Sequence, residues 1–234
     1  MELITGIDEA GRGAVIGPMV IAGVTIPKSN ETTLKKLGVK DSKLLSPKKR
    51  EELYEKIEKL SSNISIMSVQ SCKIDNYRAM GINLDKIEAM RMAQIIDFNL
   101  NSTIYVDSLE QNSKKFKQLI VSFLQNKNAD LIVENYLDES VIVVGAASII
   151  AKVERDKAIK EIEQRAGYPI GVGYSHDPLT IKFVENLIKE TKGNLPDFVR
   201  KSWVTTEQLM ENSLQRKVKD FFFGRKKECE EEHL

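Results

Sequence analysis

The sequence has few cysteines, no long apolar run and no excess of charge of either sign. Its two cysteines, Cys72 and Cys229, are far apart and form no CxxC pair, which argues against a disulfide scaffold or a cysteine zinc site. No apolar stretch approaches the ~20 residues of a membrane-spanning helix. The N-terminus lacks the basic and apolar segments of a secretory signal. We therefore expect a soluble, cytoplasmic protein without a membrane partner.

The overall charge is nearly balanced, with 35 Lys and Arg residues against 34 Asp and Glu residues and a net charge of +1. Global charge therefore does not indicate a nucleic-acid partner. Residues 35–50 differ, because they hold seven cations and a single acid, Asp41. Such a local run fits either an anionic partner or a solvated face of the protein.

The length of 234 residues suits one compact domain with a small appendage. We expect a main domain over residues 1–200. Residues 201–234 are expected to form a C-terminal helical extension, with a helix from about Thr205, and an acidic tail.

Strand patterns alternate with helical ones along the main domain. Residues 2–7 and 18–26 are rich in β-branched residues and are joined by a glycine-rich link, which predicts an antiparallel pair. Three further strands are predicted over residues 63–70, 102–107 and 129–136. Helices are predicted to begin near Ser46, Asn83, Ser113, Gly145 and Asp177. The order indicates an α/β fold with a mixed sheet flanked by helices.

Four acids lie where predicted strands end. Asp8 and Glu9 end the first strand, Asp107 ends another, and Asp138 lies just beyond the last. Sites in open α/β sheets form at the carboxyl ends of strands. Converging carboxylates repel one another unless a cation joins them, and oxygen ligands without His or Cys suit Mg²⁺ or Mn²⁺. The alternative is that single acids serve as helix caps or solvated loop residues.

The adjacent acids raise a geometric difficulty. Neighbouring side chains of a strand point to opposite faces of the sheet. Asp8 and Glu9 can therefore share one metal site only if the strand ends or bends there. Gly11 and Gly13 allow such a bend.

Five longer strings resemble the conserved blocks of type 2 ribonucleases H, specifically the archaeal type. They are GIDEAGRGAVIGPMVIA, KDSKLLSPKKRE, GAASIIAKVERD, GYSHDPLT and FVRKSW, and they follow the family order over roughly residues 3–203. The resemblance implies a ribonuclease H-like fold with a mixed five-stranded sheet, and it makes the main domain a catalytic one.

The resemblance also implies an activity. Family members hydrolyse the RNA strand of RNA–DNA hybrids and cut 5′ to ribonucleotides embedded in duplex DNA, leaving a 3′-hydroxyl and a 5′-phosphate. Two Mg²⁺ or Mn²⁺ ions are expected on Asp8, Glu9, Asp107 and Asp138; Glu134 and Glu139 are alternatives to Asp138. The competing hypotheses are a non-catalytic nucleic-acid-binding protein and another member of the ribonuclease H-like superfamily.

Substrate contacts follow from the same resemblance. The backbone of Gly11, Arg12 and Gly13 is expected to read the 2′-hydroxyl, which distinguishes RNA from DNA. Tyr174 is expected to stack at the junction nucleotide, although by itself it fits a loop anchor. Phosphate or backbone contacts are expected from Lys43, Ser148 and Lys152. For Lys152 the alternative is an i, i+4 pair with Asp156, and His176 is expected to be a loop contact.

The C-terminal extension carries a second resemblance. Gln215, Val218, Phe221 and Phe222 resemble the box with which many proteins bind a sliding clamp, in the helix-in-groove style. The alternative is that Val218 and Phe221 pack the C-terminal helix onto the domain. Archaeal-type relatives imply a monomer.

Overall fold

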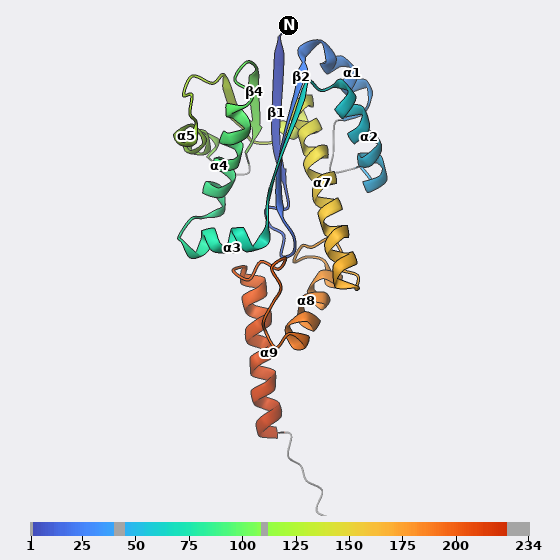
Figure 1. Cartoon of the computed structure of the whole chain (residues 1–234), viewed down its shortest axis with the longest axis vertical. Coiled ribbons are helices and arrows are strands. Elements are labelled where there is room, and N and C mark those ends of the chain that lie inside the picture. Colours follow the sequence, from blue (N-terminus) through green and yellow to red (C-terminus); the bar gives the residue numbers. More distant parts are fainter. Residues whose placement is uncertain (1, 40–44, 109–111, 224–234) are drawn as a thin grey trace, which may run out of the picture.

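The computed structural model describes residues 2–39, 45–108 and 112–223, with side chains described as far as residue 213. Five strands form one mixed sheet in the order β3-β2-β1-β4-β5 (Figure 1). β1 pairs antiparallel with β2, and β2 pairs antiparallel with β3, whereas β4 and β5 continue the sheet in parallel. This confirms the predicted mixed five-stranded sheet. The strands are β1 Leu3–Ala10, β2 Met19–Pro27, β3 Asn63–Val69, β4 Thr103–Asp107 and β5 Leu131–Glu134.

Helices cover both faces of the sheet. The long helix α7 packs across β1 and β2 on one face, while α4 and α5 cover the other face. Gly6 in β1 permits the close approach of α7, because a Cβ atom there would lie 2.3 Å from the backbone of Val143. The helices are α1 Glu31–Lys36, α2 Pro47–Leu60, α3 Ser71–Ala79, α4 Leu84–Asp97, α5 Ser113–Phe123, α6 Leu137–Ser140, α7 Ile142–Ala166, α8 Pro178–Glu190 and α9 Val204–Phe223.

The predicted helix starts are mostly confirmed at the level of the capping bonds. Ser46 accepts a hydrogen bond from the Lys49 amide and precedes Pro47, the first residue of α2. Asn83 caps α4, and Asp177 caps α8 in the same way. The helix predicted to begin near Ser113 does begin at that residue as α5, and its capping side chain is that of Asn112, which accepts the Lys115 amide.

The first and last strands end elsewhere than the sequence suggested. β1 continues through Asp8 and Glu9 to Ala10, paired with β2 throughout. Its parallel partner β4 leaves it after Ile7, which opens the sheet beside Asp8. β5 ends at Glu134, and Asp138 therefore lies in the next element, the short helix α6. The acids thus lie at the end of β1 with a difference of one residue from the prediction, since pairing with β2 continues to Ala10.

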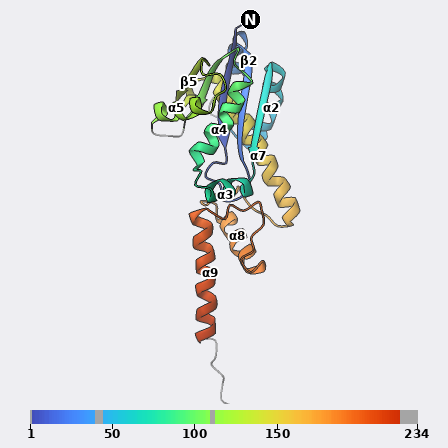
Figure 2. The same cartoon turned by 60° about the vertical axis from the view of Figure 1, so that its left-hand side comes forward.

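A third apolar cluster, between α8, the end of α7 and the segment 195–203, lies beyond the lower end of the sheet. Met210 near the start of α9 contacts the turn at Gly193. The remainder of α9 extends away from the sheet in both views (Figures 1 and 2). None of the described helices combines the length and apolarity that crossing a membrane requires.

Candidate active site

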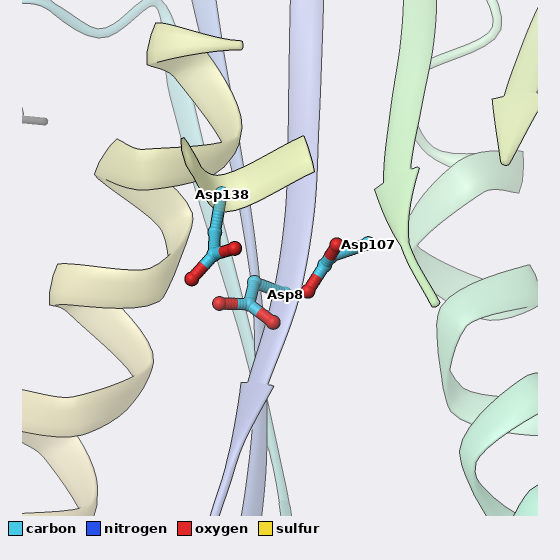
Figure 3. Close-up of side chains that lie close together, drawn as sticks. All are labelled: Asp8, Asp107 and Asp138. Carbon is cyan, nitrogen blue, oxygen red and sulfur yellow. The ribbon is translucent and has the colours of Figure 1, made fainter. Parts of the chain in front are cut away.

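Three buried aspartates meet at the point where β1 and β4 separate (Figure 3). Asp8 comes from β1, Asp107 from the end of β4 and Asp138 from α6. One carboxylate oxygen from each lies within 4.8 Å of the other two, and all three side chains are buried. Such a set of hard oxygen donors suits a divalent cation such as Mg²⁺ or Mn²⁺.

Backbone hydrogen bonds hold these carboxylates in place. Asp107 Oδ1 accepts the Leu137 amide at 2.8 Å, which fastens the end of β4 to the helix that carries Asp138. Asp8 Oδ1 accepts the Glu9 amide at 2.7 Å. The alternatives to Asp138 lie differently, because Glu134 and Glu139 are both exposed. Burial among the acids thus favours Asp138 over either rival.

The electrostatics of the cluster fit a bound cation. Burial is the main cause that raises the pKa of Asp8; the nearby Lys152 and a hydrogen bond from Ser148 oppose it, and the charge of Asp138 adds to it. Buried carboxylates that repel one another are stabilised in their charged form by a metal ion. The residues present therefore fit a divalent metal.

Glu9 is not one of the three acids whose oxygens converge, although it lines the same cavity and the charges of Asp8 and Asp107 act on it. It is adjacent to Asp8 in a strand that continues, so its side chain points to the opposite face, toward α4. Burial, followed by the charge of Glu88, raises the pKa of Glu9 well above its usual value. Glu9 Oε2 is buried and has no hydrogen-bond partner among the described residues. Its role as a metal ligand stays a prediction.

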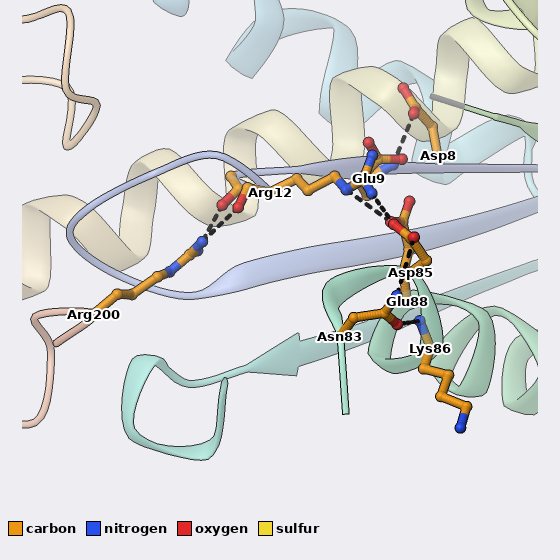
Figure 4. A network of polar contacts seen from close by, with 9 residues as sticks. Asp8, Glu9, Arg12, Asn83, Asp85, Lys86, Glu88 and Arg200 are labelled. Atoms are coloured by element: carbon orange, nitrogen blue, oxygen red, sulfur yellow. Dashed lines mark hydrogen bonds and ion pairs between the residues drawn. The ribbon is translucent and has the colours of Figure 1, made fainter. Parts of the chain in front are cut away.

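Arg12 also turns toward α4 (Figure 4). Its Nη2 pairs with Asp85 Oδ1, and its Nε lies 3.1 Å from Glu88 Oε2. Burial raises the pKa of Glu88 to about 7, while the Arg12 charge opposes that shift. The sequence-based hypothesis is that the main chain of Arg12 contacts the substrate. Because the side chain turns toward α4, the main chain of this residue remains at the cavity.

The loop that follows β1 is held from behind by Arg200. This arginine is fully buried and donates to the carbonyl oxygens of Gly11 at 2.5 Å, Arg12 at 2.6 Å and Gly17 at 3.1 Å. Gly11 adopts φ +83°, and a Cβ atom there would lie 2.5 Å from Arg155 Nε. At Gly13, by contrast, a Cβ atom would meet no atom within 4 Å.

Tyr174 closes the loop from the other side. Its hydroxyl accepts the Gly11 amide at 3.1 Å, and residue 174 forms an isolated bridge with Ala14. The Arg155 guanidinium lies 4.4 Å from the centre of the Tyr174 ring. His176 stacks against the same ring, with the centroids 5.5 Å apart. The structure therefore places Tyr174 as part of the loop's support and also beside the cavity.

The two residues of α7 that are predicted to contact the nucleic-acid backbone, Ser148 and Lys152, lie near Asp8. Lys152 Nζ donates to Ser148 Oγ, and both residues affect the Asp8 carboxylate. Asp156, the alternative partner of Lys152, forms an ion pair with Arg50 at 2.8 Å. Lys43 lies outside the described residues.

A cavity of about 680 Å³ connects these elements. Its lining includes the charged residues Arg50, Arg155 and Asp156. It also includes these residues named in the sequence-based prediction: Asp8, Glu9, Gly11, Arg12, Gly13, Asp107, Asp138, Lys152, Tyr174 and His176.

Sequence reasoning missed two residues of this region, Glu88 and Arg200. Glu88 occupies the apolar stripe of α4 that continues with Met92 and Ile95, at i+4 and i+7, so an acid at that position was a usable signal. Arg200 belongs to the FVRKSW string, for which the resemblance implies no specific role of this arginine.

The predicted clamp-binding box lies on α9. Gln215, Val218, Phe221 and Phe222 belong to the helix, which runs to Phe223, while their side chains lie outside the described part of the structure. The structure therefore tests neither the clamp-binding prediction nor the alternative in which Val218 and Phe221 pack against the domain.

Comparisons with known proteins identify the family to which the chain is similar. A family model described as Ribonuclease HII matches residues 5–206. The Ribonuclease HII of Methanococcus maripaludis strain C5 is 43% identical over 221 residues, covering 93% of this chain and 91% of that protein.

Two solved structures are similar along most of the chain. The ribonuclease H2 from Pyrococcus horikoshii OT3 superposes with a TM-score of 0.81 and 36% identity, covering 90% of this chain and 98% of that one. The RNase HII of a PCNA:RNase HII complex from Archaeoglobus fulgidus gives a TM-score of 0.77 and 37% identity, covering 86% and 95%.

Proposed function

The chain belongs to the ribonuclease HII family and is a metal-dependent endoribonuclease of RNA–DNA hybrids; we propose that it also cuts duplex DNA 5′ to single embedded ribonucleotides, using two metal ions. The observation that carries this proposal is the position of the Gly11–Gly13 loop directly beside the aspartate cluster in one cavity. Recognition and cleavage would then take place at neighbouring atoms.

The aspartates define where the phosphodiester is cut. Asp8, Asp107 and Asp138 would hold the divalent cations, with Glu9 as a further predicted ligand from the other face. Cations bound there would supply the charge that activates water and stabilises the departing 3′ oxygen. Lys152, next to Asp8, supports the negative charge of that carboxylate and lies where it can contact a phosphate.

The loop defines which bond is cut. Its glycines expose backbone to the cavity, and Gly13 leaves room on that side because no protein atom fills the Cβ position. The Tyr174 hydroxyl accepts the Gly11 amide, so its own proton is not used in that bond. A ribose 2′-hydroxyl can both donate and accept, and it would find partners of both kinds here.

The test uses a DNA duplex with one embedded ribonucleotide, incubated with Mg²⁺ or Mn²⁺, and an all-DNA duplex of the same sequence. We expect a single cut 5′ to the ribonucleotide, with a 3′-hydroxyl and a 5′-phosphate at the ends. Cleavage of the all-DNA duplex at a similar rate would contradict the proposed selectivity. No cleavage of either duplex by a preparation that degrades a long hybrid would contradict the junction activity itself.

We also propose that Gln215, Val218, Phe221 and Phe222 bind a sliding clamp, since an archaeal relative was solved in complex with PCNA. Together with the proposed monomeric state, this predicts one clamp subunit bound per chain. The double variant Phe221→Ala/Phe222→Ala should lose binding to an archaeal clamp in a calorimetric titration. The matched control is Leu209→Ala, nearer the start of α9, and equal affinity of wild type and double variant would reject the box.

A further inference from the structure

Glu88 is a buried acid that the reaction described above does not use. It lies on α4, outside the aspartate cluster, with 1% of its side chain exposed. Neither of its oxygens completes a hydrogen bond of normal geometry within the described residues. It lies beside two residues of the predicted site, because Arg12 Nε is 3.1 Å from Glu88 Oε2 and the charge of Glu88 helps to raise the pKa of Glu9.

The start of α4 holds Arg12 at two points. Asp85 and Glu88 stand at i and i+3, so they share one face of the helix and receive the two ends of the guanidinium (Figure 4). Asn83 stabilises this first turn of α4 through two hydrogen bonds. Its Oδ1 accepts the Lys86 amide at 3.1 Å, and its Nδ2 reaches Asp85 Oδ2 at 3.4 Å.

This arrangement decides which part of the loop faces the substrate. An arginine at the edge of a nuclease cavity binds phosphate well whatever sugar carries it, which adds affinity without selectivity. Here α4 draws the side chain inward, and Arg12 is only 20% exposed. The backbone of residues 11–13 is left to face the cavity.

Glu88 is also close to Glu9, the acid that follows Asp8 of the aspartate cluster. Glu9 lies near the end of β1 and Arg12 in the turn that follows it; Glu88 pairs with Arg12, and its charge acts on Glu9. A shift of Glu88 would therefore be transmitted to the loop and to Glu9 together.

We infer that Glu88 is a positioning residue of this enzyme, which holds Arg12 and Glu9 so that the loop presents its backbone to the substrate beside the metal carboxylates. This inference rests on the proposed reading of a 2′-hydroxyl by the loop. A purely structural acid would affect the melting temperature and leave substrate selectivity and metal affinity unchanged.

The experiment compares Glu88→Ala, Glu88→Gln and the control Glu55→Ala, which removes an exposed acid of α2. Two quantities are measured: the ratio of cleavage rates on the single-ribonucleotide duplex and on a long hybrid, and the affinity for Mn²⁺ by calorimetry without nucleic acid. Residues that orient metal ligands typically change affinity or activity by about 10–100-fold when removed. We expect Glu88→Ala to lower both quantities by about tenfold or more.

Glu88→Gln should remain near wild type, since its amide keeps the shape and can still accept from Arg12 and donate to Glu9. A folded Glu88→Ala with wild-type selectivity and wild-type Mn²⁺ affinity overturns the inference. Glutamine as harmful as alanine also overturns it, because the shape and the hydrogen bond to Arg12 that glutamine retains would then not position the loop.

If Glu88→Ala does not fold, Arg12→Met/Glu88→Met replaces it, because removing both buried charges avoids leaving one unpaired. This double variant should fold and lose selectivity, and retained selectivity would overturn the inference. A wild type that never cuts at single ribonucleotides would refute the proposed function. Glu88 would then still be judged by the Mn²⁺ affinity of its variants.

Discussion

Asp8 and Glu9 are adjacent in β1, and their carboxylates lie on opposite faces of the sheet. Ile4 and Ala10, in step with Asp8, pack with α7, whereas Ile7, in step with Glu9, packs with α4. Asp8 therefore joins Asp107 and Asp138, while Glu9 meets the Arg12–Glu88 pair. One strand thus carries two buried acids into the same cavity, one within the aspartate cluster and one beside the Arg12–Glu88 pair.

Removing one cluster carboxylate should abolish most of the activity. Asp8→Asn, Asp107→Asn and Asp138→Asn each keep the side-chain shape and lose a negative charge that a divalent cation needs. Because metal charge supplies several kcal/mol to such reactions, we expect a fall in kcat of about 10²-fold or more. Steady-state cleavage of a labelled hybrid measures it.

The matched controls for that experiment are Glu134→Gln and Glu139→Gln, the two exposed acids near Asp138. Both should keep nearly wild-type kcat. If Glu139→Gln lost activity while Asp138→Asn kept the wild-type kcat, Glu139 and not Asp138 would be the metal ligand.

Mn²⁺ should stabilise the folded protein through the same three aspartates. At ten times the dissociation constant, a ligand that binds only the folded state adds about 1.4 kcal/mol. For a chain of this size, the melting temperature should rise by roughly 3–5 °C. Scanning calorimetry with and without Mn²⁺ measures the shift. An equal shift in Asp107→Asn would place the stabilising ion elsewhere.

Stability should fall with rising pH in the metal-free protein. Burial raises the pKa of Glu88 from 4.5 to about 7, so the folded state binds this proton more tightly than the unfolded chain does. The resulting stabilisation is full below about pH 4.5 and disappears as the pH rises through about 7. This group contributes at most about 3 kcal/mol to the change.

Urea denaturation at a series of pH values tests that dependence. Glu88→Gln stays neutral throughout, so its free energy of unfolding should vary less between pH 5 and pH 8 than that of the wild type. Equal slopes in the two proteins would show that Glu88 is ionised at the same pH in the folded and unfolded chains.

The sequence predicted the elements well and their ends poorly. Periodicity and caps located α2, α4 and α8, because those signals are local. The end of β1 depends on its long pairing with β2, and the glycines after Glu9 predict a turn without showing how far that pairing continues. Arg200 is separated from Gly11 by 189 residues, so no local pattern could join them. The acids came from strand-end reasoning, and the recognition role came only from the family resemblance.

Arg200 should matter for the stability of the loop that it supports. Arg200→Met removes the guanidinium donor from the carbonyl oxygens of Gly11, Arg12 and Gly17. The Gly11 oxygen keeps a bond from the Ala14 amide and the Gly17 oxygen keeps one from the Ser71 hydroxyl. Because a carbonyl left without a donor typically costs about 1–3 kcal/mol, we expect a loss of about 1–3 kcal/mol in the free energy of unfolding. Arg200→Lys, which keeps one donor head, should lose less. Equal stability of Arg200→Met and wild type would show that the carbonyls find other donors.

Alanine substitutions at Gly11 and Gly13 should separate an effect on stability from an effect on substrate binding. Gly11→Ala should destabilise the protein, because φ +83° is strained for alanine and its Cβ would strike Arg155 and the Pro18 carbonyl. Gly13→Ala meets no protein atom, so the melting temperature should stay within a degree or two of wild type. Its methyl group would instead occupy the space left for the substrate. We expect cleavage at single ribonucleotides to fall by about tenfold or more, mainly through KM. An unchanged KM in a folded Gly13→Ala protein would mean that the substrate backbone does not approach this glycine.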